Sequence, residues 1–238
     1  MTSRASLPTL LLHWLLPQTC AHCREDLPPR WTEPLCARCR SGLTPAEPPF
    51  CRRCAEPIPI DKSFCRACAG RPFACHLVRA AFLYRGPIPG LVHAFKYRGR
   101  RAAARSAGRW MATQLGRFPE LSGCDGLVPV PIHPQRRRER GYNQAGLLAE
   151  GLSHEAGLPV LDLLQRGINT RPQWNLDQKS RRKNLAGAFQ AKPAARGRIL
   201  MLIDDVCTSG VSLEECGRAL LRAGALRVTA FVFARQTL

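Results

Sequence analysis

The chain has 238 residues, with 36 Lys and Arg against 17 Asp and Glu and a formal net charge of +19. Its apolar fraction of 45% and charged fraction of 22% exclude an intrinsically disordered protein, because this composition can bury a core. No apolar run reaches the roughly 18 residues that cross a bilayer, so we expect no membrane span. The apolar stretch 7–16 contains His13 and follows a single basic residue, Arg4, so it is a poor signal peptide and predicts a cytoplasmic location.

Eight of the 12 cysteines form four Cys-x-x-Cys pairs in the first third of the chain: Cys20/Cys23, Cys36/Cys39, Cys51/Cys54 and Cys65/Cys68. Two Cys-x-x-Cys turns close a four-coordinate structural zinc site. A disulfide framework is the alternative, but it needs an oxidising compartment. We therefore expect two structural zinc ions in a small zinc-ribbon domain, residues 1–76. Sequential pairing of the turns gives the shorter loops, although their spacing also permits interleaved pairing.

Strands and helices alternate in the expected second domain, residues 77–238. Apolar patterning predicts strands over 77–84, 126–131, 158–164, 198–203 and 226–233. It predicts helices over 91–115 with a break near Gly99, 142–154 and 212–223, and a long polar connection over 166–184. This order indicates an α/β fold with a parallel sheet, whose ligand sites lie at the carboxyl ends of the strands.

Most of the positive charge lies in this second domain. Residues 77–238 hold 26 Lys and Arg against 11 Asp and Glu. Such a field attracts nucleic acid, an anionic membrane surface or phosphorylated small molecules, although solubility alone also explains basic residues. In one continuous helix, Arg98, Arg101, Arg105 and Arg109 would form a basic stripe, for which a solvated face is the simpler interpretation.

One segment carries the chemistry. The apolar run 199–203 leads to Asp204 and Asp205, and a loop of hydroxyl side chains and Gly then opens a helix at about Ser212. A helix N-terminus with free N–H groups binds a phosphate dianion, whereas two carboxylates repel it and suit sugar hydroxyls instead. The segment therefore predicts a sugar-phosphate site. An ordinary capped helix after an acidic strand end is the alternative.

This segment resembles the phosphoribosyl pyrophosphate (PRPP) signature of type I phosphoribosyltransferases. The resemblance implies a type I phosphoribosyltransferase-like parallel sheet flanked by helices. It implies that Asp204 and Asp205 face the ribose hydroxyls of PRPP, which binds with Mg²⁺. The implied cradle of the 5′-phosphate is Val206, Cys207, Thr208, Ser209, Gly210, Val211 and Ser212.

Further segments resemble the ComF family: 128–134, 140–144, 170–173, Lys96-Tyr97 and the cysteine pairs. This resemblance covers almost the whole chain. It implies a pyrophosphate side formed by Pro131, Ile132, His133, Arg140 and Arg171. It also implies a role in bacterial DNA uptake, either natural transformation or use of DNA as a nutrient, with single-stranded DNA and proteins of the uptake machinery as partners.

The basic charge agrees with a nucleic-acid partner, because neutralising phosphates gives affinity without sequence preference. Single-strand binding also needs aromatic side chains on which bases stack. Tyr97, Tyr142 and Trp174 are the stacking candidates, although each could belong to the core. The other nucleic-acid candidates are Lys96, Arg98, Arg101, Arg105 and Arg181.

Three functions fit the sequence. The first is a DNA-handling protein that binds PRPP in a phosphoribosyltransferase fold. The second is an active phosphoribosyltransferase that transfers 5-phosphoribosyl from PRPP to a nitrogen acceptor. The third is a zinc-ribbon protein with a regulatory sugar-phosphate site. No segment for nucleobase recognition stands out, so the sequence leaves the acceptor unassigned.

Overall fold

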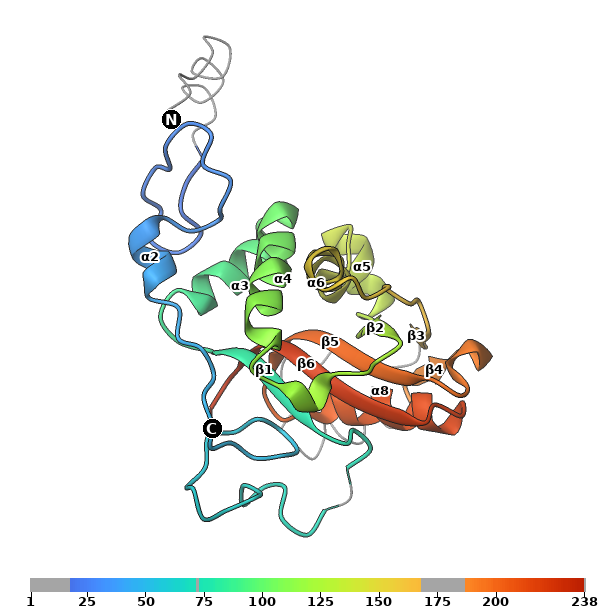
Figure 1. Cartoon of the computed structure of the whole chain (residues 1–238). Coiled ribbons are helices and arrows are strands. Elements are labelled where there is room, and N and C mark those ends of the chain that lie inside the picture. Colours follow the sequence, from blue (N-terminus) through green and yellow to red (C-terminus); the bar gives the residue numbers. More distant parts are fainter. Residues whose placement is uncertain (1–17, 72, 168–186, 238) are drawn as a thin grey trace.

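The computed structural model describes residues 18–71, 73–167 and 187–237 (Figure 1). Its centre is a parallel sheet in the order β1-β6-β5-β2. The strands are β1 (Val78–Leu83), β6 (Arg227–Arg235), β5 (Ile199–Cys207) and β2 (Gly126–Pro129). Parallel strands that are covered on both faces are apolar almost throughout, as β6 is here.

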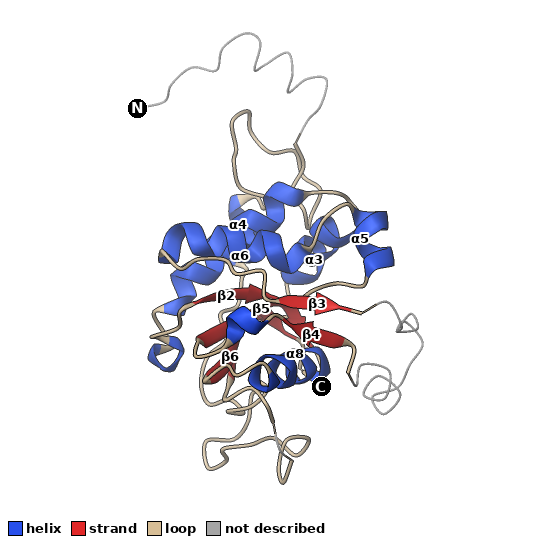
Figure 2. Ribbon diagram, turned by 90° about the vertical axis from the view of Figure 1, so that its right-hand side faces the viewer, coloured by secondary structure: helices blue, strands red, loops and turns tan. Residues whose placement is uncertain are grey.

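Helices cover both faces of this sheet (Figure 2). One face carries α3 (Ile88–Tyr97), α4 (Arg101–Leu115) and α6 (Gln144–Ala156), and the other carries α8 (Val211–Arg222). Side chains alternate along β5, so Met201 and Ile203 join the core under α3, α4 and α6, while Leu200 and Leu202 join the core under α8. The predicted α/β fold, a parallel sheet flanked by helices, is confirmed.

The expected helix over 91–115 is broken, as Gly99 indicated. Its first part ends at Tyr97, and Gly99 takes a φ of +66°, in the left-handed region that glycine adopts without a steric penalty. Because α4 starts only at Arg101, Arg98 lies outside it and the four arginines form no continuous stripe. Two short helices complete this part: α5 (Pro134–Arg140), which the sequence analysis did not predict, and the 3₁₀ turn Pro119–Leu121.

The prediction of a strand over 158–164 is wrong. Before Leu164, which begins a different strand, only Val160 of this segment forms a bridge, to Leu127 of β2. Pro159 has no N–H for a ladder, and the amide of Leu163 turns back to the carbonyl of Leu161 at 3.0 Å. The chain then forms a separate antiparallel pair, β3 (Leu164–Arg166) with β4 (Phe189–Ala191), followed by the 3₁₀ turn Pro193–Ala195.

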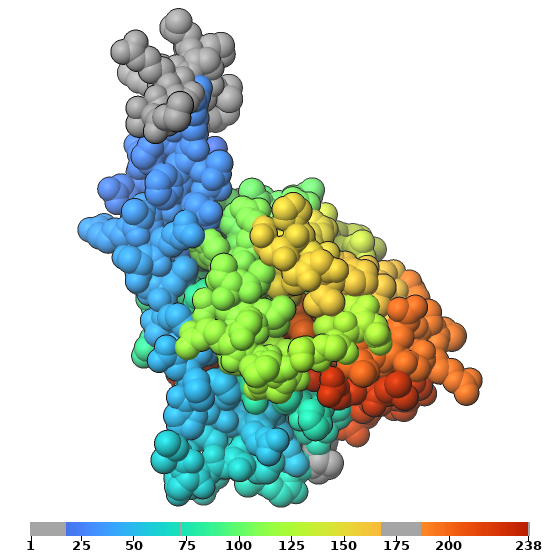
Figure 3. All heavy atoms as spheres, in the orientation of Figure 1, coloured from blue at the N-terminus to red at the C-terminus, as the bar shows by residue number. Residues whose placement is uncertain are grey.

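The N-terminal segment, residues 18–71, lies along one side of the rest of the molecule (Figure 3). It contains the short helix α2 (Ala37–Ser41). The amide of Leu83 in β1 donates to Thr44 at 2.9 Å, and the amide of Ala46 donates to Ala81 at 3.0 Å. The segment therefore covers the outer edge of β1, which would otherwise expose unpaired backbone groups.

Candidate functional site

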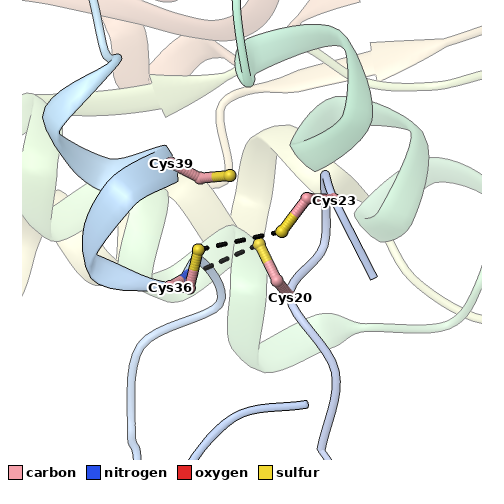
Figure 4. A group of neighbouring side chains, drawn as sticks. All are labelled: Cys20, Cys23, Cys36 and Cys39. Carbon is pink, nitrogen blue, oxygen red and sulfur yellow. Dashed lines mark hydrogen bonds between the residues drawn. The ribbon is translucent and has the colours of Figure 1, made fainter. Parts of the chain in front are cut away.

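The eight paired cysteines form two four-sulfur clusters. The first contains Cys20, Cys23, Cys36 and Cys39, and the second contains Cys51, Cys54, Cys65 and Cys68, with the sulfurs of each cluster within 4.8 Å of one another. Figure 4 shows the first cluster with its sulfurs pointing toward one another. The sequential pairing is therefore the one that the structure forms, and the interleaved pairing is excluded.

The geometry of both clusters fits zinc. Sulfurs on a tetrahedral zinc ion at about 2.3 Å lie about 3.8 Å apart. The Sγ atoms of Cys23 and Cys36 are 3.8 Å apart, and those of Cys54 and Cys65 are 3.7 Å apart. Burial raises the pKa of the Cys20 thiol, but backbone N–H groups of Cys36, His22 and Cys23 lower it to about 7 overall, which favours the thiolate that binds metal. The clusters are consistent with two structural zinc ions.

A pocket of about 330 Å³ lies at the carboxyl ends of the parallel strands. Residues that follow β1, β2 and β6, namely Tyr84, Val130 and Gln236, contribute to its wall. We call it the strand-end pocket. Besides Tyr84, its charged and hydroxyl-bearing lining residues are Lys96, His133, Arg136, Arg166, Asp204, Asp205, Thr208 and Ser212. The fold thus places a polar pocket where ligand sites of parallel sheets lie.

The two acidic residues lie within β5, which continues to Cys207, four residues beyond its expected end. Neighbouring residues of a strand point to opposite faces, so Asp205 lies on the side of α3 and Asp204 on the side of α8. Both nevertheless line the strand-end pocket. The pocket therefore reaches residues on both sides of the end of β5.

Asp205 is paired and Asp204 holds a proton more tightly than usual. Asp205 is 4% exposed, and its Oδ1 lies 2.9 Å from Nζ of Lys96. Its buried Oδ2 has no hydrogen-bond partner among the described residues. Burial, followed by the charge of Asp205, raises the pKa of Asp204 to about 7. Asp204 thus exchanges its proton near neutral pH.

The β5–α8 loop, residues 208–210, is shared between two cavities. Val206, Thr208 and Ser212 line the strand-end pocket, whereas Ser209, Gly210 and Val211 line a second cavity on the far side of the loop, which Thr208 lines as well. Gly210 caps α8 with a φ of +73°. Cys207 is buried at 2% exposure. Of the expected phosphate cradle, Val206, Thr208 and Ser212 therefore face the same pocket as the two acids. Gly210 and Val211, at the N-terminus of α8, do not.

Three of the expected pyrophosphate-side residues, Pro131, Ile132 and His133, line the strand-end pocket. Arg140 does not line it. Its Nη1 donates to Gln144 at 2.5 Å, and its guanidinium lies 5.5 Å from the centre of the Tyr97 ring. Arg171 lies outside the described residues.

Two arginines of the strand-end pocket were not predicted as ligand contacts. Arg136 belongs to α5 and Arg166 to β3, two elements absent from the sequence analysis. Lys96 was expected at nucleic acid, but its ion pair with Asp205 places it in this pocket. In the sequence, the only indication of a role for Lys96 is the Lys96-Tyr97 dipeptide that resembles the ComF family.

Tyr97 is 68% exposed, with the His93 ring at 5.0 Å. Tyr142 is 7% exposed, and its hydroxyl donates to the carbonyl of Phe95 at 2.5 Å. It belongs to the core, so the suggestion that bases stack on it is wrong.

The basic candidates differ in their surroundings. Arg98 is exposed at the end of α3. Arg101 lies 4.9 Å from the centre of the Tyr142 ring, and Arg105 pairs with Glu150 at 2.8 Å. Trp174 and Arg181 lie outside the described residues.

Comparisons with known proteins identify the cysteine-rich part of the chain. Residues 11–69 match the family model of the double zinc ribbon domain. The structure thus defines a class of protein in which a double zinc ribbon precedes a parallel α/β domain with a polar pocket at its strand ends. No helix of the described residues is long and apolar enough to span a membrane.

The predicted resemblance to the ComF family is confirmed by relatives of similar length. The chain is 28% identical over 223 residues to competence protein F of Haemophilus influenzae, which covers 91% of this chain and 96% of that protein. It is 28% identical over 225 residues to DNA utilization protein YhgH of Escherichia coli K12, with 92% and 98% covered. It is 28% identical over 213 residues to competence protein ComFC of Bacillus subtilis, with 86% and 85% covered.

Two enzymes are among the solved structures that match part of the chain. A structure of the allosteric regulatory enzyme of purine biosynthesis matches with a TM-score of 0.41 and 17% identity, over 59% of this chain and 29% of that one. Glutamine PRPP amidotransferase from B. subtilis matches with a TM-score of 0.42 and 16% identity, over 59% and 30%.

Proposed function

We propose that this protein binds PRPP, or a related sugar phosphate, in the strand-end pocket and handles single-stranded DNA in bacterial DNA uptake or utilisation. One observation carries the first part. A single pocket joins two carboxylates, Asp204 and Asp205, to Ser212 in the first turn of α8 and to cationic side chains. Carboxylates suit sugar hydroxyls, and a helix N-terminus and cations suit phosphates.

Each part of such a ligand has a counterpart in the pocket. Thr208 and Ser212, at the start of α8, suit the 5′-phosphate. His133 and Arg136 lie on the side of β2, where a pyrophosphate would extend. Mg²⁺ would enter with PRPP, because this ion prefers substrate phosphates and water to an all-protein cage.

Calorimetry with PRPP and Mg²⁺ tests this site. We expect binding by the full chain and its loss in the double variant Asp204→Asn/Asp205→Asn. Asp162→Asn is the matched control, because this carboxylate is 83% exposed, pairs with Lys192 and lies outside the pocket. Equal PRPP affinity of the wild type and the double variant would remove the assignment.

The DNA part rests on the names of the relatives and on one surface. Competence proteins and DNA utilization proteins resemble the chain over most of its length. The surface, which we call the Tyr97 surface, consists of Tyr97, Arg98, Arg101 and Arg140. An exposed aromatic ring among guanidinium groups can stack with a base and contact the neighbouring phosphates.

Binding of single-stranded DNA at several salt concentrations tests the Tyr97 surface. We expect Tyr97→Ala to weaken binding by about 1–3 kcal/mol and Tyr97→Phe to retain it. Arg98→Gln/Arg101→Gln should lower the slope of log K against log salt by about 1.4, because each phosphate contact to a single strand contributes about 0.7. The control is Arg222→Gln. Arg222 is an exposed residue at the end of α8, and its replacement should leave the slope unchanged. A salt-independent affinity would exclude phosphate contacts.

The raised pKa of Asp204 also favours a second candidate, an active phosphoribosyltransferase. A carboxylate that titrates near pH 7 can accept a proton from a nitrogen nucleophile as it attacks C1′ of PRPP. The wild-type chain, supplied with PRPP, Mg²⁺ and a panel of nucleobases and amines, would then release pyrophosphate. Release with none of them, in a chain that binds PRPP, supports a binding protein.

A further inference from the structure

The β5–α8 loop has the second cysteine cluster behind it. The cavity on the far side of the loop has a volume of about 450 Å³. It is lined from the N-terminal segment by Cys54, Cys65 and Cys68, and from the sheet domain by Ser209, Gly210 and Arg235. The C-terminal end of β6, which carries Arg235, lies beside the N-terminal segment (Figure 1).

Arg235 joins the two sides of this cavity. It is 1% exposed, although it is a charged residue. Its Nη2 donates to Oε2 of Glu56 at 2.5 Å. Its Nη1 donates to the carbonyl oxygens of Cys207, at 2.8 Å, and of Thr208. One guanidinium therefore connects the N-terminal segment to the two residues at which the loop leaves β5.

These contacts orient the loop amides. In a trans peptide the C=O and the N–H point in opposite directions. When the carbonyls of Cys207 and Thr208 point toward Arg235, the N–H groups of Thr208 and Ser209 in the same peptide planes point away from it. For the N–H of Thr208, that direction leads toward the strand-end pocket, because Thr208 lines this pocket as well as the far cavity, whereas Arg235 lines only the far cavity.

The second cluster fixes the position of Glu56. Glu56 lies two residues after Cys54, and its carbonyl accepts the amide of Cys51 at 2.7 Å. In addition, the thiol of Cys207 donates to the carbonyl of Cys54 at 3.8 Å. A metal that joins Cys51 and Cys54 to the other two sulfurs thus holds the turn from which Glu56 projects.

The first cluster has a different neighbour. Its residues Cys20 and Cys39 pack in the core on the side of α3, whereas Ala55 of the second ribbon packs in the core on the side of α8. His22 lies against Gly90 of α3. Both clusters thus consist of four cysteines, but only the second lines the cavity behind the β5–α8 loop.

We propose that the second metal cluster, acting through Glu56 and Arg235, holds the β5–α8 loop in the conformation that presents the N–H of Thr208 to an anion in the strand-end pocket. Arg235 is then a positioning residue that touches no ligand. The effect on loop order stands by itself, and the effect on affinity rests on the proposed PRPP function.

Glu56→Gln tests this proposal in the full, zinc-loaded chain. The substitution keeps the shape and removes the charge that pairs with Arg235, while all eight cysteines remain. We expect two zinc ions per chain, as in wild type, but hydrogen exchange of the amides of 207–212 that is faster by about tenfold, which corresponds to one charge-assisted hydrogen bond. PRPP affinity should fall by a similar factor.

Glu47→Gln is the matched control, because Glu47 also lies in the N-terminal segment and pairs with an arginine of the sheet domain, Arg117, at 3.1 Å, but on the exposed surface. It should leave exchange of 207–212 unchanged. Cys65→Ser should accelerate this exchange and Cys36→Ser should not, although each removes one cluster. Wild-type exchange in Glu56→Gln, or equal acceleration by both cysteine variants, would overturn the proposal.

Exchange is measured without ligand, so the two proposals fail separately. A loosened loop in Glu56→Gln, combined with no PRPP binding by the wild type, would support the coupling and reject the PRPP assignment. If the wild type binds PRPP, and Glu56→Gln changes neither the exchange nor the affinity, the PRPP assignment is supported and the coupling is rejected.

Discussion

Nζ of Lys96 lies 2.9 Å from Oδ1 of Asp205, so α3 supplies a cation to an acid at the end of β5. The next residue, Tyr97, is exposed, because neighbouring residues of a helix point about 100° apart. The last turn of α3 therefore contributes to both the strand-end pocket and the Tyr97 surface. A sugar phosphate and a nucleic acid bound at these places would be neighbours.

We expect Lys96→Met to lower the free energy of unfolding by about 2 kcal/mol at pH 8, because it leaves a buried carboxylate without its cation. Urea unfolding measures this change. In Lys96→Met/Asp205→Asn the uncompensated charge is gone, and the loss should be smaller than in Lys96→Met alone.

Lys192→Met is the control for this cycle. Its partner Asp162 is 83% exposed, and an exposed ion pair contributes at most about 1 kcal/mol. A double variant at Lys96 and Asp205 that loses the sum of the two single losses would show that the pair is not coupled.

The pKa of Asp204 predicts a pH dependence of stability. Burial and the charge of Asp205 raise this pKa from 3.8 to about 7. The folded chain therefore binds a proton that the unfolded chain has released, and the free energy of unfolding falls as the pH rises through about 4 to 7. Between pH 6 and pH 8.5 this single group lowers it by about 1.4 kcal/mol.

Asp204→Asn should abolish this contribution. Compared with wild type, the variant should gain about 1.4 kcal/mol in relative stability between pH 6 and pH 8.5, while it loses PRPP binding. Urea unfolding of both proteins at the two pH values measures the difference. A pH-independent difference between them would mean that Asp204 titrates outside this range.

The sequence predicted those parts of the site that are local in the chain. The apolar run of β5, its two acids and the hydroxyl loop are consecutive, and the cysteine turns are regularly spaced. The eight cysteine ligands could therefore be predicted before the structure, as could the proximity of Asp204 to the start of α8, whereas the division of the cysteines between the two clusters could not.

Parts that depend on tertiary contacts could not be predicted. Lys96 meets Asp205 only because α3 packs over the end of β5. Arg166 reaches the pocket from a strand that has three residues and pairs with residues more than 20 positions later, so it leaves no periodic pattern. Arg235 ends a buried strand, where a charged residue gives no local indication of its partner Glu56, which is 179 positions away.

Metal analysis should find about two zinc ions per chain, and Cys36→Ser should retain one. The reason is that the two clusters share no ligand, so each binds its metal separately. Cys124→Ser is the control, since Cys124 belongs to neither cluster, and it should retain both ions. A chain without zinc, whose mass falls by about 2 Da for each bridge formed, would instead support the disulfide framework.

Close packing of α4 on α6 depends on two glycines that face each other. A Cβ atom on Gly108 would overlap the carbonyl oxygen of Leu148, and one on Gly151 would overlap that of Arg105. Because backbone atoms cannot rotate away as a flexible side chain can, the two helices would have to separate. We therefore expect Gly108→Ala and Gly151→Ala each to lower the free energy of unfolding by about 1–3 kcal/mol, measured by urea unfolding.

Gly116→Ala separates this packing effect from helix propensity. Gly116 lies at the end of α4 with a φ of −60°, and a Cβ there would meet nothing within 4 Å. Alanine is also a better helix former, so this variant should be neutral or slightly more stable. If Gly108→Ala were equally harmless, α4 and α6 would not pack as closely at Gly108 and Gly151 as the structure has them.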